Sequence, residues 1–339
     1  MMRTEAATNN SENATGSSRN VPSKAEGIAL CSAFVLVFVL VVVGNLLTIA
    51  LFGMNRSLRK KSLHLVINMA FADLMLGILS LPLFIHSVGY RFGLWKGGWP
   101  MSLSIFYTIV DTFFSQASLI SAYFISGERF YAIYWPFKHR TLSTRAYHII
   151  IFSVWVLTLL VTALFSTTHF LFSVKRSMYY WIPYVLIITF IICGCNIGIW
   201  RKFRRGIVAS QQQTRNSRNK RLTKTLLFVS VLGSLCWILL VILNCLIFVY
   251  DVKIPWKFYD LVNLINYSNS FANPVMYALR IPEFREALAL CCLRRAAAPN
   301  MMDIKRRSKK TPSTELRALR TDSSLLQLNL KEEVLDTKL

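Results

Sequence analysis

The chain has 339 residues, of which 54% are hydrophobic and only 16% are charged, and its formal net charge is +23. Ordinary soluble proteins carry about 25% charged residues, so runs of about 20 apolar residues here indicate a polytopic membrane protein. The basic residues lie in short blocks between the apolar runs. That pattern is typical of cytoplasmic loops and argues against nucleic-acid binding.

Residues 1–27 are expected to form an extracellular tail. They are polar, and the apolar run that follows is too long for the core of a cleavable signal peptide and lacks its small-residue cleavage site. That run is therefore interpreted as a signal anchor. Two glycosylation sequons begin at Asn9 and Asn13, and such sequons matter only on the lumenal side and are common by chance.

Seven apolar segments follow, and each is long enough to cross about 30 Å of hydrocarbon at about 1.5 Å per residue. Each is predicted to be a helix, because lipid cannot satisfy an open backbone. The fold class predicted over 28–281 is an all-α membrane protein with a seven-transmembrane helix bundle. The segments are 28–53, 63–88, 101–133, 146–168, 178–200, 222–250 and 258–280.

The basic residues also predict the orientation in the membrane. Lys and Arg are concentrated after the first, third, fifth and seventh segments, and 201–224 alone holds nine of them with no acid. Loops rich in Lys and Arg stay in the cytoplasm. The amino terminus is therefore expected outside the cell and the carboxyl terminus inside, in a multi-pass protein of the plasma membrane.

Asp73 lies in the middle of the second segment, where an ionisable group is expensive and is a functional hypothesis by default. Amides and hydroxyls occur at similar depth in other segments. A carboxylate among such oxygens could hold a small hard cation or share a proton, and the alternative is a satisfied structural hydrogen-bond cluster. The polar residues considered are Asn45, Asn68, Ser115, Ser118, Asn266, Asn269 and Asn273.

Asp111 is the second acid identified within a segment. It precedes Ser118 by seven residues and Arg129 by 18, so all three lie near one face of the third helix. Asp111 is then about 27 Å from Arg129, in the outer half of the membrane, where it would suit a cationic ligand. The alternative is an ion pair with a protein base, for which the candidates are Lys175, Arg176 and Lys257.

Trp237 and Tyr267 are aromatic residues that either line a cavity near Asp111 or simply pack and face lipid. Pro82, Pro183 and Pro274 interrupt helices at depth. Prolines in such positions mark bending points when neighbouring groups satisfy the released carbonyls.

Short motifs along the chain resemble those of the rhodopsin-like G protein-coupled receptors, in the family's order and from about residue 28 to 293. The resemblance implies a receptor, and not an enzyme, that binds an extracellular small-molecule ligand and activates a heterotrimeric G protein. The motifs are Gly44-Asn45, LVINMAFAD at 65–73, Glu128-Arg129-Phe130, Trp155, Cys236-Trp237 and Asn273-Pro274-Val275-Met276-Tyr277.

The resemblance also implies roles for these residues. Glu128 and Arg129 correspond to the pair that holds the inactive state, with the Arg turning to the G protein on activation; Phe130 replaces the usual Tyr. Pro274 and Tyr277 correspond to the hinge in the seventh helix.

In the outer half, Asp111 corresponds to the ammonium counter-ion of amine receptors, with Tyr267 as its partner, and Trp237 to the toggle aromatic. Ser115 and Asn244 complete the expected ligand site. No cofactor is expected apart from an allosteric sodium ion near Asp73 and Ser118. The sodium site expected from the resemblance comprises Asn45, Asp73, Ser118, Asn269 and Asn273.

The remaining carboxyl-terminal residues resemble the family's regulatory region. Residues 282–293 are expected to form a short amphipathic eighth helix, with Cys291 and Cys292 as palmitoylation sites beside membrane lipid. Residues 294–339 are expected to be disordered and to offer sites for a receptor kinase and arrestin, or to be inert. Thr337 and Leu339 fit a PDZ groove, although three residues often match by chance.

The sequence departs from the family at several positions. Ser104 replaces the Cys that usually bridges the third helix to the second extracellular loop, Leu239 replaces a Pro and Ile191 a Tyr. Asn219 stands where an acid often shares the conserved Arg. Glu128 is then the main partner of Arg129, so the inactive state is held weakly and raised basal activity is predicted.

The ligand is left open between three classes. A small amine is the first hypothesis, although the fifth segment lacks the hydroxyls of catecholamine sites and offers Lys175, Arg176 and Tyr179 instead. A peptide or a nucleoside is the alternative, since 269–288 also resembles the adenosine and melanocortin receptors. An opsin is argued against because Tyr267 occupies the position of the Schiff-base lysine.

Two functions of a different class were weighed against the receptor. A transporter or channel would need a continuous polar path or internal repeats, and an intramembrane enzyme would need a catalytic motif. The sequence shows neither repeats nor such a motif.

Overall fold

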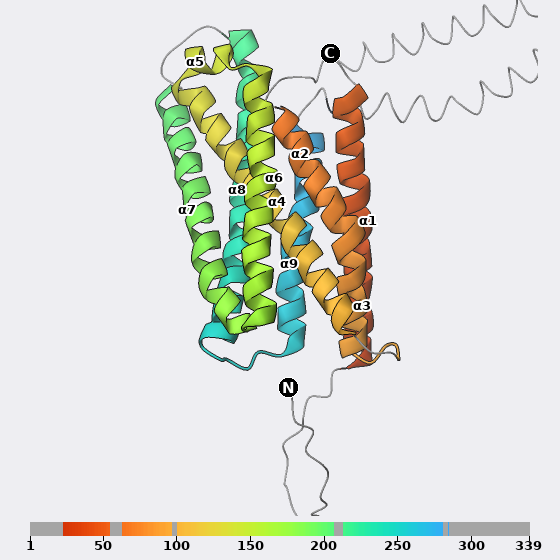
Figure 1. Cartoon of the computed structure of the whole chain (residues 1–339). Helices are drawn as coiled ribbons and strands as arrows, with labels where there is room; N and C mark the ends of the chain where they lie inside the picture. Colours follow the sequence, from red (N-terminus) through yellow and green to blue (C-terminus); the bar gives the residue numbers. More distant parts are fainter. Residues whose placement is uncertain (1–22, 55–62, 97–99, 207–212, 281–283, 285–339) are drawn as a thin grey trace, which may run out of the picture. The chain divides into compact units, whose positions relative to one another are not determined.

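The structure is a computed structural model, and it describes residues 23–54, 63–96, 100–206, 213–280 and 284. Within these ranges all regular structure is helical, and Figure 1 shows the long helices lying side by side as a bundle. The elements are α1 (Lys24–Met54), α2 (Leu63–Met75), η2 (Leu76–Ser80), α3 (Leu81–Arg91), α4 (Met101–Tyr134), α5 (Pro136–Thr141), α6 (Thr144–Leu171), α7 (Val174–Gly206), α8 (Gln213–Asn244), η3 (Cys245–Val249) and α9 (Trp256–Arg280).

The predicted all-α bundle is confirmed, and each of the seven predicted segments coincides with a helix or a continuous run of helices. Six helical stretches in the described residues are long and apolar enough to cross a membrane. The seventh, α9, has 25 residues but a more polar composition. Its polar residues include Asp260, Asn269 and Asn273, which belong to the polar clusters described below.

The second predicted segment contains a local change of helix type. Leu76–Ser80 forms a π-helical turn between α2 and α3, and Pro82 follows in the first turn of α3. Because Pro82 has no backbone N–H, it cannot bond the carbonyl four residues earlier, and a widened turn accommodates that loss. The turn carries Ser80, whose hydroxyl donates a hydrogen bond to Asp111 of α4.

α8 runs as a regular helix through Leu239, the position where the family usually has Pro. Its regular hydrogen bonding ends at Asn244, where the π-helical turn η3 begins. Leu239 keeps the backbone N–H that a proline would lack, and the irregular turn lies at 245–249 instead.

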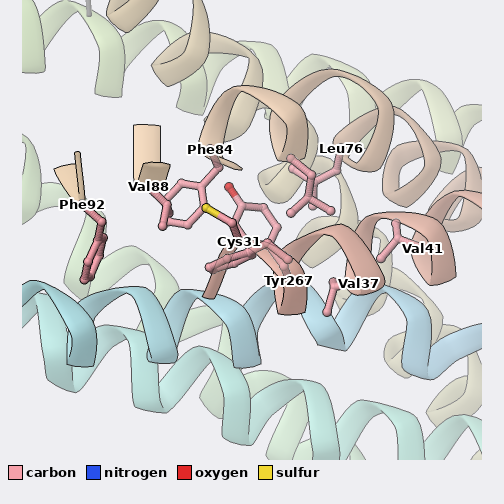
Figure 2. Close-up of a cluster of buried hydrophobic side chains, with 10 residues drawn as sticks. Cys31, Val37, Val41, Leu76, Phe84, Val88, Phe92 and Tyr267 are labelled. Atoms are coloured by element: carbon pink, nitrogen blue, oxygen red, sulfur yellow. The ribbon is translucent and has the colours of Figure 1, made fainter. Parts of the chain in front are cut away.

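The bundle is held together by α4 and α9. α4 packs against α2, α6, α7 and α8, while α9 packs against α1 and α8. Figure 2 shows part of the apolar core, where Tyr267 of α9 lies among side chains such as Phe84 and Val37. Because the hydroxyl of Tyr267 points out of this apolar cluster to polar partners, the packing fixes the position of one member of the predicted ligand site.

Several predicted features lie outside the described residues. These are the sequons at Asn9 and Asn13, the eighth helix over 282–293 apart from Phe284, the palmitoylation sites Cys291 and Cys292, the tail 294–339 and its terminal Thr337 and Leu339. Asn219 lies in α8, but its side chain is not among those described.

Candidate ligand and switch sites

Asp111 lies in a cluster of hydroxyl groups. Its Oδ1 accepts a hydrogen bond of 2.6 Å from the Tyr267 hydroxyl and a further hydrogen bond from Ser80. The hydroxyls of Tyr107 and Tyr267 are 3.2 Å apart. Three helical elements, η2, α4 and α9, therefore meet at this carboxylate.

None of the three bases proposed as alternative partners pairs with Asp111 in the described structure. Lys175 Nζ lies 2.7 Å from Asp251 Oδ2, and Lys257 Nζ lies 3.5 Å from Glu26 Oε1. The Arg176 guanidinium lies 5.3 Å from the centre of the Phe172 ring. The negative charge of Asp111 is thus solvated by neutral hydroxyls and is not balanced by these cations.

The predicted ligand residues Ser115 and Asn244 do not hydrogen-bond to Asp111 in the described structure. Ser115 donates to the carbonyl of Thr112 at 3.2 Å, and Asn244 donates to the carbonyl of Leu240 at 2.9 Å. Both bonds are local to their own helices.

Asp73 forms a second cluster, in the middle of the bundle. Its Oδ1 accepts a hydrogen bond of 2.7 Å from Ser118, and its Oδ2 accepts one of 2.9 Å from Asn273. Asn45 donates to the carbonyl of Ser270 at 3.1 Å, which joins α1 to the same stretch of α9. The structure therefore brings together four residues that the sequence placed on four different segments.

Asn68 belongs to a separate bridge. Its Nδ2 donates to Ser121 of α4, and its Oδ1 accepts from the Trp155 indole of α6, each at 3.0 Å. This amide therefore fixes the packing of α2 against α4 and α6.

A cavity lies between the Asp73 cluster and α8. It is lined by Ser118, Asn269, Asn273, Gly233 and Trp237, with apolar side chains from α4, α7 and α8. The side-chain oxygen of Asn269 is buried and has no hydrogen-bond partner in the described structure. An unpartnered carbonyl oxygen beside a cavity favours a hydrogen-bond donor, such as water, or a cation as the occupant of that cavity.

Gly233 contributes to this cavity by its lack of a side chain. A Cβ at that position would lie 3.2 Å from Asn269 Oδ1, which is tighter than ordinary contact. Trp237 lies in the next turn of α8, with its ring 6.3 Å from that of Trp181. The cavity beside Gly233 therefore adjoins the Trp237 side chain.

Glu128 and Arg129 are both buried near the inner end of α4. Arg129 Nε lies 3.0 Å from Glu128 Oε2. The other carboxylate oxygen, Oε1, accepts a hydrogen bond of 3.0 Å from the Tyr147 hydroxyl and lies 2.7 Å from His139 Nε2. His139 and Tyr147 were not predicted as partners of Glu128, because α4 ends at Tyr134 and both residues lie on separate helices, so no helical spacing links them to Glu128.

The remaining predicted switch residues are packed in apolar surroundings. The ring of Phe130 stacks on Tyr134 at 4.3 Å, and the buried ring of Tyr277 meets Phe52 edge-on at 6.1 Å. Pro274 lies inside α9, where a Cβ on Gly44 would come within 3.1 Å of it. The glycine therefore allows α1 to approach the proline closely.

A third buried acid, Asp260, was also missed. It is fully buried in α9 and forms an ion pair with Arg91 at the end of α3. The Arg91 guanidinium lies 5.6 Å from the ring centre of Phe84 and 5.4 Å from that of Trp256. Aromatic faces suit a guanidinium, so this pair joins α3 to α9 in a partly apolar setting.

Comparison with known proteins identifies what this arrangement is similar to. A family model described as 7 transmembrane receptor (rhodopsin family) matches residues 44–277. Adenosine receptor A3 of Ovis aries is 24% identical over 283 residues, which are 76% of this chain and 87% of the relative. Trace amine-associated receptor 13c of Danio rerio is 26% identical over 78% of this chain and 85% of the relative. Histamine H2 receptor of Cavia porcellus is 27% identical over 77% of this chain and 79% of the relative.

Proposed function

Because the chain belongs to the rhodopsin family of seven-transmembrane receptors, we propose that it is a plasma-membrane receptor for a small extracellular amine. The coarser function, that of a multi-pass G protein-coupled receptor, follows from the family. The ligand class and an extracellular amino terminus are the proposal.

The environment of Asp111 carries the amine proposal. The carboxylate accepts hydrogen bonds from Tyr267 and Ser80 but pairs with none of the candidate bases in the described structure. A half-buried carboxylate within a membrane bundle is costly without a cation, and an ammonium ligand would balance its charge. Two of the relatives, named for trace amines and histamine, support this class.

A nucleoside is the second candidate, and one observation favours it. The relatives include Adenosine receptor A3 of Ovis aries, which matches along 87% of its own length. The hydroxyls of Tyr107 and Tyr267 and the Asp111 carboxylate also suit the hydroxyl and amide groups of a nucleoside. The two candidates differ in whether the ligand needs a negative charge at Asp111.

The ligand class is tested with the substitution Asp111→Asn. An amine agonist should lose at least about 30-fold in potency, since loss of one partner of a buried charge pair costs roughly 2–5 kcal/mol. The measurement is a second-messenger dose response to a panel of amines, nucleosides and short peptides. Asp251→Asn, which removes an exposed carboxylate, is the control, and an unchanged response at Asp111→Asn would exclude an amine held there.

We propose that Arg129 leaves Glu128 on activation and contacts the G protein. The pair is buried, and Glu128 is the acid recorded beside Arg129 in the described structure. Arg129→Ala should therefore abolish agonist-driven G protein signalling while surface expression persists. Arg145→Ala is the control, since Arg145 is exposed at the start of α6; normal signalling by Arg129→Ala would refute the mechanism.

We propose that the residues around Asp73 hold a sodium ion as an allosteric ligand. Carboxylate, hydroxyl and amide oxygens are hard ligands that suit such a cation, and Asn269 Oδ1 is a buried oxygen without a partner in the described structure. Asp73 and Ser118 are the expected ligands, with Asn45, Asn269 and Asn273 around them. The ion would stabilise the arrangement in which α2, α4 and α9 meet.

A further inference from the structure

The carboxylate of Glu128 makes contacts at both oxygen atoms. Oε2 faces Arg129, whereas Oε1 faces His139 of α5 and Tyr147 of α6. The Tyr147 hydroxyl and His139 Nε2 are themselves 3.2 Å apart, so the three groups form a closed triangle. Glu128 therefore has partners on two elements that do not depend on Arg129.

From this geometry we propose that His139 and Tyr147 are positioning residues that stabilise Glu128 when Arg129 leaves it. The inference rests on the proposed switching of Arg129. Removing one partner from a buried ion pair is normally costly because the other charge is left uncompensated. Here the hydroxyl of Tyr147 and the imidazole of His139 continue to solvate Oε1, which lowers the cost of releasing the guanidinium.

The charge of His139 determines how strongly it stabilises the Glu128 carboxylate. Imidazole changes its charge between about pH 5 and pH 8, and the His139 side chain is 22% exposed, so protons from the cytoplasm reach it. A protonated His139 balances the Glu128 carboxylate and repels the positive charge of Arg129. Both effects favour release of Arg129, so basal activity should rise as cytoplasmic pH falls.

The groups around His139 agree with a rise of basal activity at low pH. In the described residues, His139 contacts the carboxylate of Glu128 and the hydroxyl of Tyr147. The Tyr131 ring lies edge-on to the imidazole with centroids 6.4 Å apart. Imidazole is the side chain whose charge can change near neutral pH, so His139 would supply the pH sensitivity beside Glu128.

The test uses the purified full-length receptor in lipid nanodiscs, with spin labels at Arg145 on α6 and Lys224 on α8. The distance distribution is measured without ligand between pH 6 and pH 8. We expect the longer, open distance to gain on the order of threefold in population at the lower pH, as for a charge-assisted bond that strengthens on protonation. A distribution that does not change with pH would overturn the proposal.

Three variants separate the roles of the residues. His139→Gln, which donates a hydrogen bond but cannot be protonated, should remove the pH dependence, and Tyr147→Phe should reduce the open population at every pH. His148→Gln is the matched control, because His148 is exposed beside Tyr147 and packs on His64. A response that persists in His139→Gln, or disappears in His148→Gln, would refute the assignment to His139.

Nucleotide exchange by added G proteins, measured on the same samples, keeps the two proposals apart. If the open population responds to pH through His139 but no G protein exchanges nucleotide, the assigned coupling fails and the His139 mechanism stands. If exchange occurs and neither readout depends on His139, this inference fails and the receptor function stands.

Discussion

At the scale of single residues, the charges that matter most differ in burial. Asp260 is fully buried and pairs with Arg91, whose side chain is 20% exposed, whereas Lys175 and Asp251 are 44% and 75% exposed. Screening by water leaves an exposed pair worth little, while a buried charge that loses its partner is strongly destabilising. The same kind of contact therefore has very different consequences at the two sites.

This contrast predicts the effect of two matched substitutions. Asp260→Asn should destabilise the folded receptor by about 3–5 kcal/mol, because it leaves Arg91 among Phe84 and Trp256 without its carboxylate. Asp251→Asn should cost less than about 1 kcal/mol. Thermal unfolding in detergent, followed by tryptophan fluorescence, compares the two, and equal losses would contradict the role given to burial.

The sequence predicted part of the polar clusters around Asp73 and Asp111 and left other members of them unassigned. Asp73 and Asn273 could be placed together because each stands in a motif that fixes its depth, and the resemblance placed Ser118 with them. Tyr267 was expected beside Asp111 from the resemblance, whereas Ser80 could not be assigned to it, since Ser80 is 31 positions away and no motif fixed its rotation about the helix. Hydrogen bonds between helices depend on packing angles that a single sequence does not report.

At the scale of elements, the cavity between α4, α7, α8 and α9 depends on one small residue. Gly233 lies on the same helix as Trp237, and its lack of a side chain leaves space beside Asn269 of α9. Cores normally lack such voids, and a void beside an aromatic side chain leaves it room to change rotamer. The cavity is therefore expected to ease rearrangement of α8 on activation.

Filling the cavity provides the test. Gly233→Leu should lower agonist-driven nucleotide exchange, and overpacking should cost about 1–3 kcal/mol of stability. Gly194→Leu is the control, because a Cβ at that exposed position of α7 would meet nothing within 4 Å. Both substitutions change helix propensity alike, so full activity of Gly233→Leu would show that activation does not need the space.

The helices were predictable as elements, whereas their irregular turns were not. Long apolar runs between basic loops predicted every membrane segment, since lipid demands a helix of that length. The π turns at 76–80 and 245–249 depend on local carbonyl partners and tertiary contacts. Likewise, α5 is only six residues long, so its helical periodicity was too short to be detected in the basic loop after α4.

At the scale of the whole molecule, charges join one end of the bundle. Arg91 of α3 pairs with Asp260 of α9, Lys257 of α9 with Glu26 of α1, and Lys175 of α7 with Asp251 in the loop between η3 and α9. The cysteines in the described residues are free, namely Cys31, Cys193, Cys195, Cys236 and Cys245. Ser104 stands where the resemblance led us to expect a bridging cysteine.

This arrangement predicts that the receptor is insensitive to reducing agents. Loss of a structural disulfide typically costs about 2–5 kcal/mol, which would lower the thermal midpoint of a bundle this size by about 5 °C or more. We therefore expect the midpoint of the purified receptor to agree within about 1 °C with and without dithiothreitol, whereas Asp260→Asn should lower it in both conditions. A disulfide-bonded protein treated in parallel controls for the activity of the reductant. A clear fall of the midpoint on reduction alone would show that a disulfide, and not the buried Arg91–Asp260 pair, is the main tether of the outer helix ends.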